Sequence, residues 1–139
     1  MKRLACMALM AGLAAAVAQV RVGAQSEDTP SIKEVMQKLH KGAKAPLIMV
    51  RKDVQANPPK WDEVKKLTKD FVILGAGLAK NDPPRGDKGH WTKLANQYFE
   101  NAKAMDDAAQ KEDKSAVLAA RGKLTASCKA CHDAHQERH

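Results

Sequence analysis

The chain has 139 residues and a formal net charge of +8, from 24 basic and 16 acidic residues. The length suits one domain. Because the basic residues are spread along the chain and interleaved with acidic ones, the charge pattern does not indicate a nucleic-acid-binding protein. The positive surplus could instead favour acidic protein partners by electrostatic steering. Aromatic residues make up only 4% of the sequence, so the side chains alone supply little large apolar area for a core.

The N-terminus has the parts of a secretory signal peptide. Lys2 and Arg3 precede an uncharged, largely apolar run over residues 4–20, and small residues follow that suit a signal peptidase. We therefore expect residues 1–24 to be cleaved, so that an exported domain of residues 25–139 remains without stable membrane insertion. It would carry 21 basic and 16 acidic residues, a net charge of +5. The alternative is an uncleaved membrane anchor, since the apolar run is marginally long enough to span a bilayer.

The mature sequence predicts helices, because no segment alternates at the period of a strand. The first predicted helix begins with a capping box at Ser31 and Glu34. Gly42 and Pro46 interrupt or kink this helix before it resumes and ends at residues 57–59. Its apolar stripe begins with Ile32, Val35, Met36 and Leu39.

Three more helices follow, at about residues 61–80, at about 88–110, and from near residue 113 into the C-terminal segment. Gly75 and Gly77 indicate close helix packing rather than a dinucleotide-binding turn, since no strand precedes them. Four helices with short loops predict an all-α fold, an antiparallel four-helix bundle. The expected core faces carry Val64, Leu67, Phe71, Leu74, Leu78, Trp91, Leu94, Ala95, Tyr98, Ala102, Met105, Val117, Ala120, Leu124 and Ala126.

The last predicted helix carries C-x-x-C-H, the attachment signature of a c-type haem, with Cys128, Cys131 and His132. Thiols at positions i and i+3 share a helix face and can add to the two vinyl groups of a haem, and the adjacent histidine can be the proximal iron ligand. A C-x-x-C pair alone could also be a redox dithiol, a disulfide or part of a zinc site that His135 and His139 complete. Because the motif occurs together with an export signal, we expect one covalently attached haem c.

A secreted four-helix chain with the haem motif on its last helix resembles the class II c-type cytochromes, the cytochrome c′ group. The resemblance covers essentially all of residues 25–139, as an order of helices plus one motif. It implies a haem-binding four-helix bundle in which Cys128 and Cys131 form the thioethers and His132 is the proximal ligand. Relatives often dimerise through the first two helices, which allows a homodimer here, although Pro46 would bend that surface.

The resemblance implies two functional types. In one, an apolar side chain of the first helix closes the distal face, and five-coordinate iron binds nitric oxide or carbon monoxide. In the other, a methionine of the first helix ligates the iron, which gives an electron carrier. Met36 lies on the first apolar stripe at about the family's distal position, so it is the predicted distal ligand. Its thioether would raise the haem potential relative to a second histidine. The alternatives are that Met36 packs on the ring without bonding, or that His40, one turn on, is the ligand.

The remaining histidines and methionines have no assigned chemistry in the sequence. His135 follows His132 by one helical turn, so it cannot reach the opposite face of the same iron, and we expect it to be solvated or to contact a propionate. His90 is expected at the surface or in a helix cap. Met49 and Met105 are expected in the core.

The sequence therefore predicts an exported monohaem cytochrome that carries one electron at a time and docks briefly with redox protein partners. No substrate bond changes in that function, so we do not expect an enzyme. One alternative is a five-coordinate binder of nitric oxide or carbon monoxide. A second is a haem-free helical module held by zinc or a disulfide.

Overall fold

The computed structural model describes residues 29–137, so the predicted signal peptide of residues 1–24 and His139 lie outside the described residues. Within residues 29–137 the chain is all-helical, which confirms the predicted all-α class. It forms five α-helices and one short 3-10 helix, and no strand. These are α1 (Ile32–His40), α2 (Pro46–Val54), α3 (Trp61–Gly75), the 3-10 helix η1 (Leu78–Lys80), α4 (Lys88–Gln110) and α5 (Lys114–His135).

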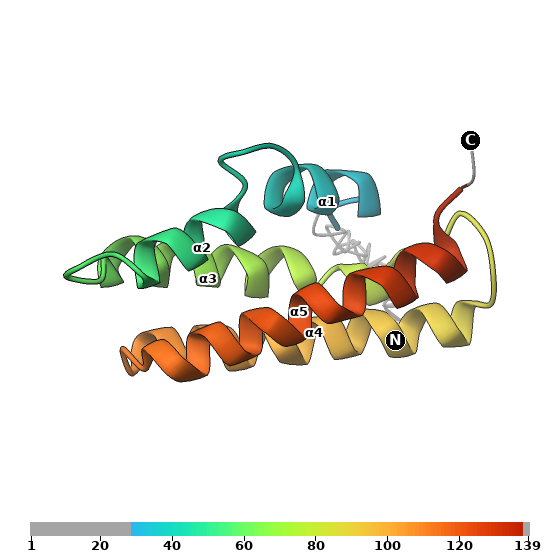
Figure 1. Ribbon diagram of the computed structural model, residues 1–139. Coiled ribbons are helices and arrows are strands. Elements are labelled where there is room, and N and C mark those ends of the chain that lie inside the picture. Colours follow the sequence, from blue (N-terminus) through green and yellow to red (C-terminus); the bar gives the residue numbers. More distant parts are fainter. Residues whose placement is uncertain (1–28, 138–139) are drawn as a thin grey trace, which may run out of the picture.

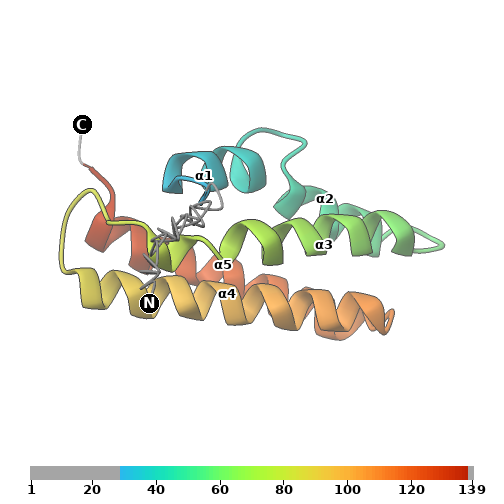
Figure 2. The same ribbon diagram turned by 180° about the vertical axis from the view of Figure 1, so that it is seen from behind.

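The two longest helices, α4 and α5, pack along each other and run in opposite directions (Figure 1). α3 packs on α4, and α2 packs on both α3 and α5. The short α1 contacts α2 and α3, and it lies over the half of the molecule that contains the end of α5 (Figures 1 and 2). Across residues 29–137, no helix is both long enough and apolar enough to cross a bilayer.

The first predicted helix is two separate helices, α1 and α2. Its capping box is confirmed, because the Glu34 amide donates to Ser31 Oγ at 3.2 Å and the Ser31 amide donates to Glu34 Oε2 at 2.9 Å. Gly42 adopts a φ of +92°, a left-handed conformation that glycine tolerates. Pro46 occupies the first turn of α2, where no amide hydrogen is needed. The two breakers therefore end one helix and begin another.

The second predicted helix ends five residues early, at Gly75 instead of residue 80. A Cβ atom on Gly75 would lie 3.1 Å from the Tyr98 ring, and one on Gly77 would lie 3.1 Å from Pro30. The two glycines thus allow close packing, as predicted, but they also weaken the helix, and only the short η1 follows. The next two helices match their predictions: α4 spans the predicted range, and α5 begins after Asp113, whose carboxylate accepts the Ala116 amide at 2.9 Å.

One apolar cluster joins all five α-helices, and its largest buried members include Phe71, Met105 and Leu124. Ala126, predicted in the core, is exposed. Two residues after Leu124 on a helix, it points to nearly the opposite side of α5. Met105 is fully buried and Met49 is half-buried. Leu67 and Leu74 are half-buried against the edge of the cluster, and Leu94 is half-buried outside it.

Replacing Gly75 with valine should lower the free energy of unfolding by roughly 1–3 kcal/mol, because the added carbons would overpack against the Tyr98 ring. The matched control is Gly122→Val in α5, where no neighbouring atom lies within 4 Å of a Cβ. That change should shift the free energy by less than about 0.5 kcal/mol. Urea denaturation followed by circular dichroism measures both, and equal effects would show that the α3–α4 contact does not require glycine.

Candidate functional site

The C-x-x-C-H motif lies near the C-terminal end of α5. Cys128 and Cys131 share one side of the helix and are half-buried, whereas His132 is exposed. Both cysteines are free thiols, and Cys128 Sγ donates to the Leu124 carbonyl oxygen at 3.5 Å. Burial raises the pKa of both thiols, and at Cys131 the neighbouring Cys128 adds to this effect. Both thiols are therefore protonated at neutral pH. They do not form a disulfide with each other.

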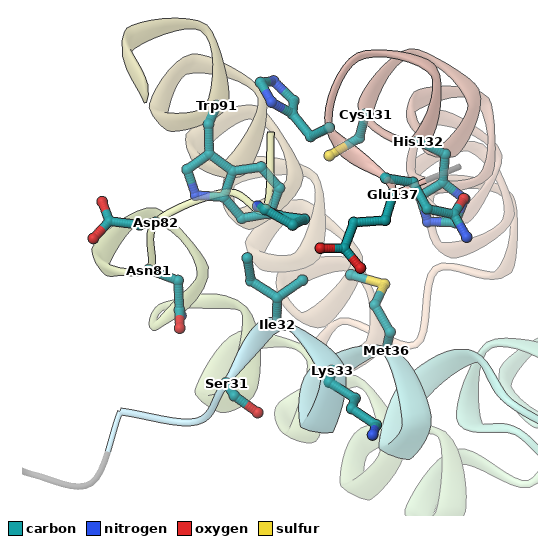
Figure 3. A pocket seen from close by; sticks show the side chains of 13 residues that line it. Ser31, Ile32, Lys33, Met36, Asn81, Asp82, Trp91, Cys131, His132 and Glu137 are labelled. Carbon is teal, nitrogen blue, oxygen red and sulfur yellow. The ribbon is translucent and has the colours of Figure 1, made fainter. Parts of the chain in front are cut away.

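A pocket of about 590 Å³ opens between α1, the loop before α4, and the end of α5. Ile32 and Met36 line it from α1, Trp91 from α4, and Cys131 and His132 from α5. Figure 3 shows the Met36 side chain extending from α1 toward the helix that carries Cys131 and His132. The volume lies in the range of roughly 300–1,000 Å³ that is typical of small-molecule and cofactor sites.

A second, smaller space of about 30 Å³ adjoins this pocket. Met36, Trp91, Cys131 and His132 line both spaces, while His40 and Cys128 line only the smaller one. All five residues that the sequence predicts for the site therefore line one or both of these adjoining spaces. They are Met36, His40, Cys128, Cys131 and His132. Their roles as haem-attachment and iron-binding residues stay predictions.

His40 is tied to α4 by a long-range hydrogen bond. Its Nε2 lies 2.9 Å from Tyr98 Oη, and its ring meets the edges of the Phe71 and Tyr98 rings. Burial, with a smaller contribution from the nearby His132, lowers the pKa of His40 to about 4, so the imidazole is neutral at pH 7. Burial also raises the pKa of Tyr98. Tyr98 was predicted only as a core residue, and nothing in its local sequence signals a contact with a histidine 58 positions earlier.

His135 does not meet solvent as expected, because it is only 2% exposed. Its Nδ1 lies 2.9 Å from the Arg85 carbonyl oxygen, its Nε2 lies 3.1 Å from His90 Nδ1, and its ring packs edge-on against Trp91. The prediction of a solvated side chain is wrong because this face of α5 turns toward α4 and the preceding loop. His90 is at the surface, as predicted, and its amide is capped by Asp87.

Arg85 completes the connection between that loop and the end of α5. Its Nε donates to the Gln136 carbonyl oxygen at 2.6 Å, and its guanidinium also donates to the Asp133 carbonyl. These are carbonyls that the last turn of a helix leaves without partners. Gly86 has a φ of +83°, and a Cβ atom there would lie 2.9 Å from His135 Nδ1. The loop therefore needs glycine at this position to reach the helix.

The zinc alternative finds little support in the part of the chain that the structure describes. There, no group of three or more histidine, cysteine or carboxylate side chains is placed to hold a metal ion. Cys128, Cys131, His132 and His135 therefore do not form such a group, and His139 lies outside the described residues.

We expect His135→Leu to lower the free energy of unfolding by roughly 1–3 kcal/mol, because the Arg85 carbonyl would lose its hydrogen-bond partner in a partly buried contact. The control is His90→Leu, which removes the exposed member of the histidine pair and should cost less than about 1 kcal/mol. Urea denaturation at pH 7.5 compares the two variants. A larger loss in the His90 variant would contradict the role given to the Arg85 contact.

Comparison with protein families gives one match. Residues 86–136 match the model of the family described as Cytochrome C'. The matched segment runs from Gly86 through α4 and includes Cys128, Cys131 and His132 on α5. It supports a class II c-type cytochrome of the cytochrome c′ family, and this family implies haem c. The searches of curated proteins and of solved structures gave no match.

Proposed function

We propose that this class II c-type cytochrome is an exported one-electron carrier with a single covalently bound haem c and axial ligands His132 and Met36. The observation that carries the proposal is that Met36 on α1 and His132 on α5 line the same two adjoining spaces. A thioether and an imidazole on different helices can approach a flat cofactor from its two faces. The cytochrome c′ match supports either an electron carrier or a gas binder, and the distal ligand decides between them.

The residues present fit haem c. Cys128 and Cys131 supply two uncommitted thiols on one helix face, and the larger pocket presents Ile32 and Trp91 as apolar surface beside them. In the proposed fold, α2 to α5 form an antiparallel four-helix bundle with the haem on the last helix. When bound, the haem supplies an iron that alternates between the ferric and ferrous states.

Met36 is better placed than His40 to be the distal ligand. The Nε2 atom of His40 is engaged by the Tyr98 hydroxyl at 2.9 Å. No hydrogen bond or ion pair of the described residues commits the Met36 thioether, and Met36 lines both spaces whereas His40 lines only one. If His132 and Met36 stay in place in both oxidation states, little structural change accompanies electron transfer.

We further propose that the protein acts by brief docking with redox protein partners, that it is not an enzyme, and that it does not bind nucleic acid. Lys33, Asp82 and Glu137 all line the larger pocket, so its charges are mixed. A partner protein that docks at this opening would therefore meet charges of both signs.

Ile48 and Ile73 are large apolar side chains that are 45% and 59% exposed, and they are candidate contacts if the chain forms a homodimer. Export rests on the predicted leader of residues 1–24, which lies outside the described residues.

Optical spectra of the haem-loaded protein test the proposed ligation. We expect low-spin bands, a weak far-red sulfur-to-iron band in the ferric form, and no response of the ferrous form to carbon monoxide. Met36→Ala should remove the far-red band and allow carbon monoxide to bind, because the iron loses a protein ligand. The control is Met49→Ala, since Met49 is half-buried on α2 and lines neither space; its spectra should match those of the unchanged protein.

The contrary result has an equally definite meaning. High-spin bands and a large carbon monoxide shift in the unchanged protein would show that Met36 only packs near the haem. The protein would then be a five-coordinate, gas-binding cytochrome c′. Low-spin spectra that survive Met36→Ala but not His40→Ala would instead identify His40 as the ligand.

A further inference from the structure

The half-buried imidazole of His40 has a buried nitrogen atom without a partner in the described residues. In the described part of the chain, His40 Nδ1 is shielded from solvent and makes no hydrogen bond. We propose that this nitrogen is a hydrogen-bond donor for a small ligand bound at the distal face. The ligand class is an anion or a strongly polarised small molecule with an exposed acceptor atom. It would bind whenever the Met36 thioether does not occupy the iron.

The proton on Nδ1 follows from counting donors and acceptors. A neutral imidazole carries one N–H, and the contact with Tyr98 Oη at 2.9 Å uses Nε2. If Nε2 donated to Oη, the buried Tyr98 hydroxyl would have no acceptor for its own hydrogen in the described residues. If the hydroxyl donates to Nε2, only Nδ1–H remains unsatisfied. The second arrangement leaves fewer buried groups without partners, so it is favoured.

The smaller space holds no other uncommitted hydrogen-bond donor outside the C-x-x-C-H motif. Among its polar lining residues, the Tyr98 hydroxyl is engaged with His40, and Ser127 Oγ donates to the Leu124 carbonyl oxygen at 2.8 Å. The Trp91 indole N–H is also committed, because it donates to the Leu78 carbonyl oxygen at 3.0 Å. The remaining lining side chains outside the motif and His40 are apolar, among them Leu78 and Leu94. In such surroundings a hydrogen bond to a charged acceptor is stronger than in water.

The inference requires bound haem, as in the proposed function, but it does not require Met36 to be the iron ligand. The experiment therefore starts from the haem-loaded Met36→Ala variant, whose distal position is open whichever ligation the unchanged protein has. Failure of the proposed ligation would appear in the spectra of the unchanged protein. Failure of the His40 inference would appear only in the ligand titrations of the variants.

The ferric form of Met36→Ala is titrated with sodium fluoride, and its ferrous form with carbon monoxide. Fluoride is a strong hydrogen-bond acceptor and carbon monoxide is a weak one. Adding His40→Leu should weaken fluoride binding about tenfold, equivalent to about 1.4 kcal/mol, because a charge-assisted hydrogen bond is lost. Carbon monoxide affinity should change by less than about threefold, since packing is largely kept.

Three further variants on the Met36→Ala background separate donation from packing. His40→Gln keeps a side-chain N–H and should recover part of the fluoride affinity. Tyr98→Phe removes the group that orients the imidazole and should weaken fluoride more than carbon monoxide. Thr125→Ala is the matched control, because Thr125 is exposed, lines neither space, and its hydroxyl already donates to the Arg121 carbonyl oxygen; it should leave both affinities unchanged.

Selective loss of fluoride affinity in the His40 and Tyr98 variants would support the inference. Equal losses for fluoride and carbon monoxide, or no loss for either, would overturn it and leave His40 as a structural residue. If His40→Leu does not incorporate haem, the titrations of Tyr98→Phe and His40→Gln decide the question. The deciding quantity is again the loss of fluoride affinity relative to the loss of carbon monoxide affinity.

Discussion

The geometry of the site depends on how the end of α5 is held against the loop that precedes α4. Arg85 supplies partners for carbonyls of the last turn, and His135 binds the Arg85 carbonyl from inside the protein. Gly86 makes the close approach sterically allowed. Without this connection the last turn would fray, because helix ends leave their final carbonyls without partners. His132 precedes His135 by one turn, so the same contacts hold the backbone of the turn that carries it.

The opposite wall of the site depends on a second long-range contact, between His40 on α1 and Tyr98 on α4. The Tyr98 hydroxyl commits one imidazole nitrogen, and burial leaves the other without a partner. One hydrogen bond therefore has two consequences. It engages Nε2 of His40, and it leaves Nδ1 without a partner on a residue that lines the same space as Met36, Cys131 and His132. In the proposed function, the contact with Tyr98 therefore separates the role of His40 from that of Met36.

The sequence predicted the parts of the structure that short-range signals encode. The capping box at Ser31 predicted the start of α1, Gly42 and Pro46 predicted an interruption after it, and the last helix begins near residue 113 as expected. These signals each act within a few residues. The sequence also named Met36 and His40 as candidate distal ligands; both line a space together with Cys131 and His132, and their ligand roles stay predictions. The sequence did not predict the His40–Tyr98 bond or the burial of His135. These contacts join positions 58 and 50 residues apart, and they exist only once the helices have packed.

The break between α1 and α2 leaves Met36 and His40 together on one short helix. α1 has nine residues, and isolated helices shorter than about 12–15 residues are marginal in water. Its position is therefore set by tertiary contacts: the buried Val35 and Leu39, and the bond from His40 to Tyr98. Met36 and His40 are one turn apart on this short helix, so they share a face and move together. A change that breaks the His40–Tyr98 bond should therefore also affect how Met36 is held, so the proposed ligation by Met36 and the proposed hydrogen bond from His40 would be coupled through a single helix.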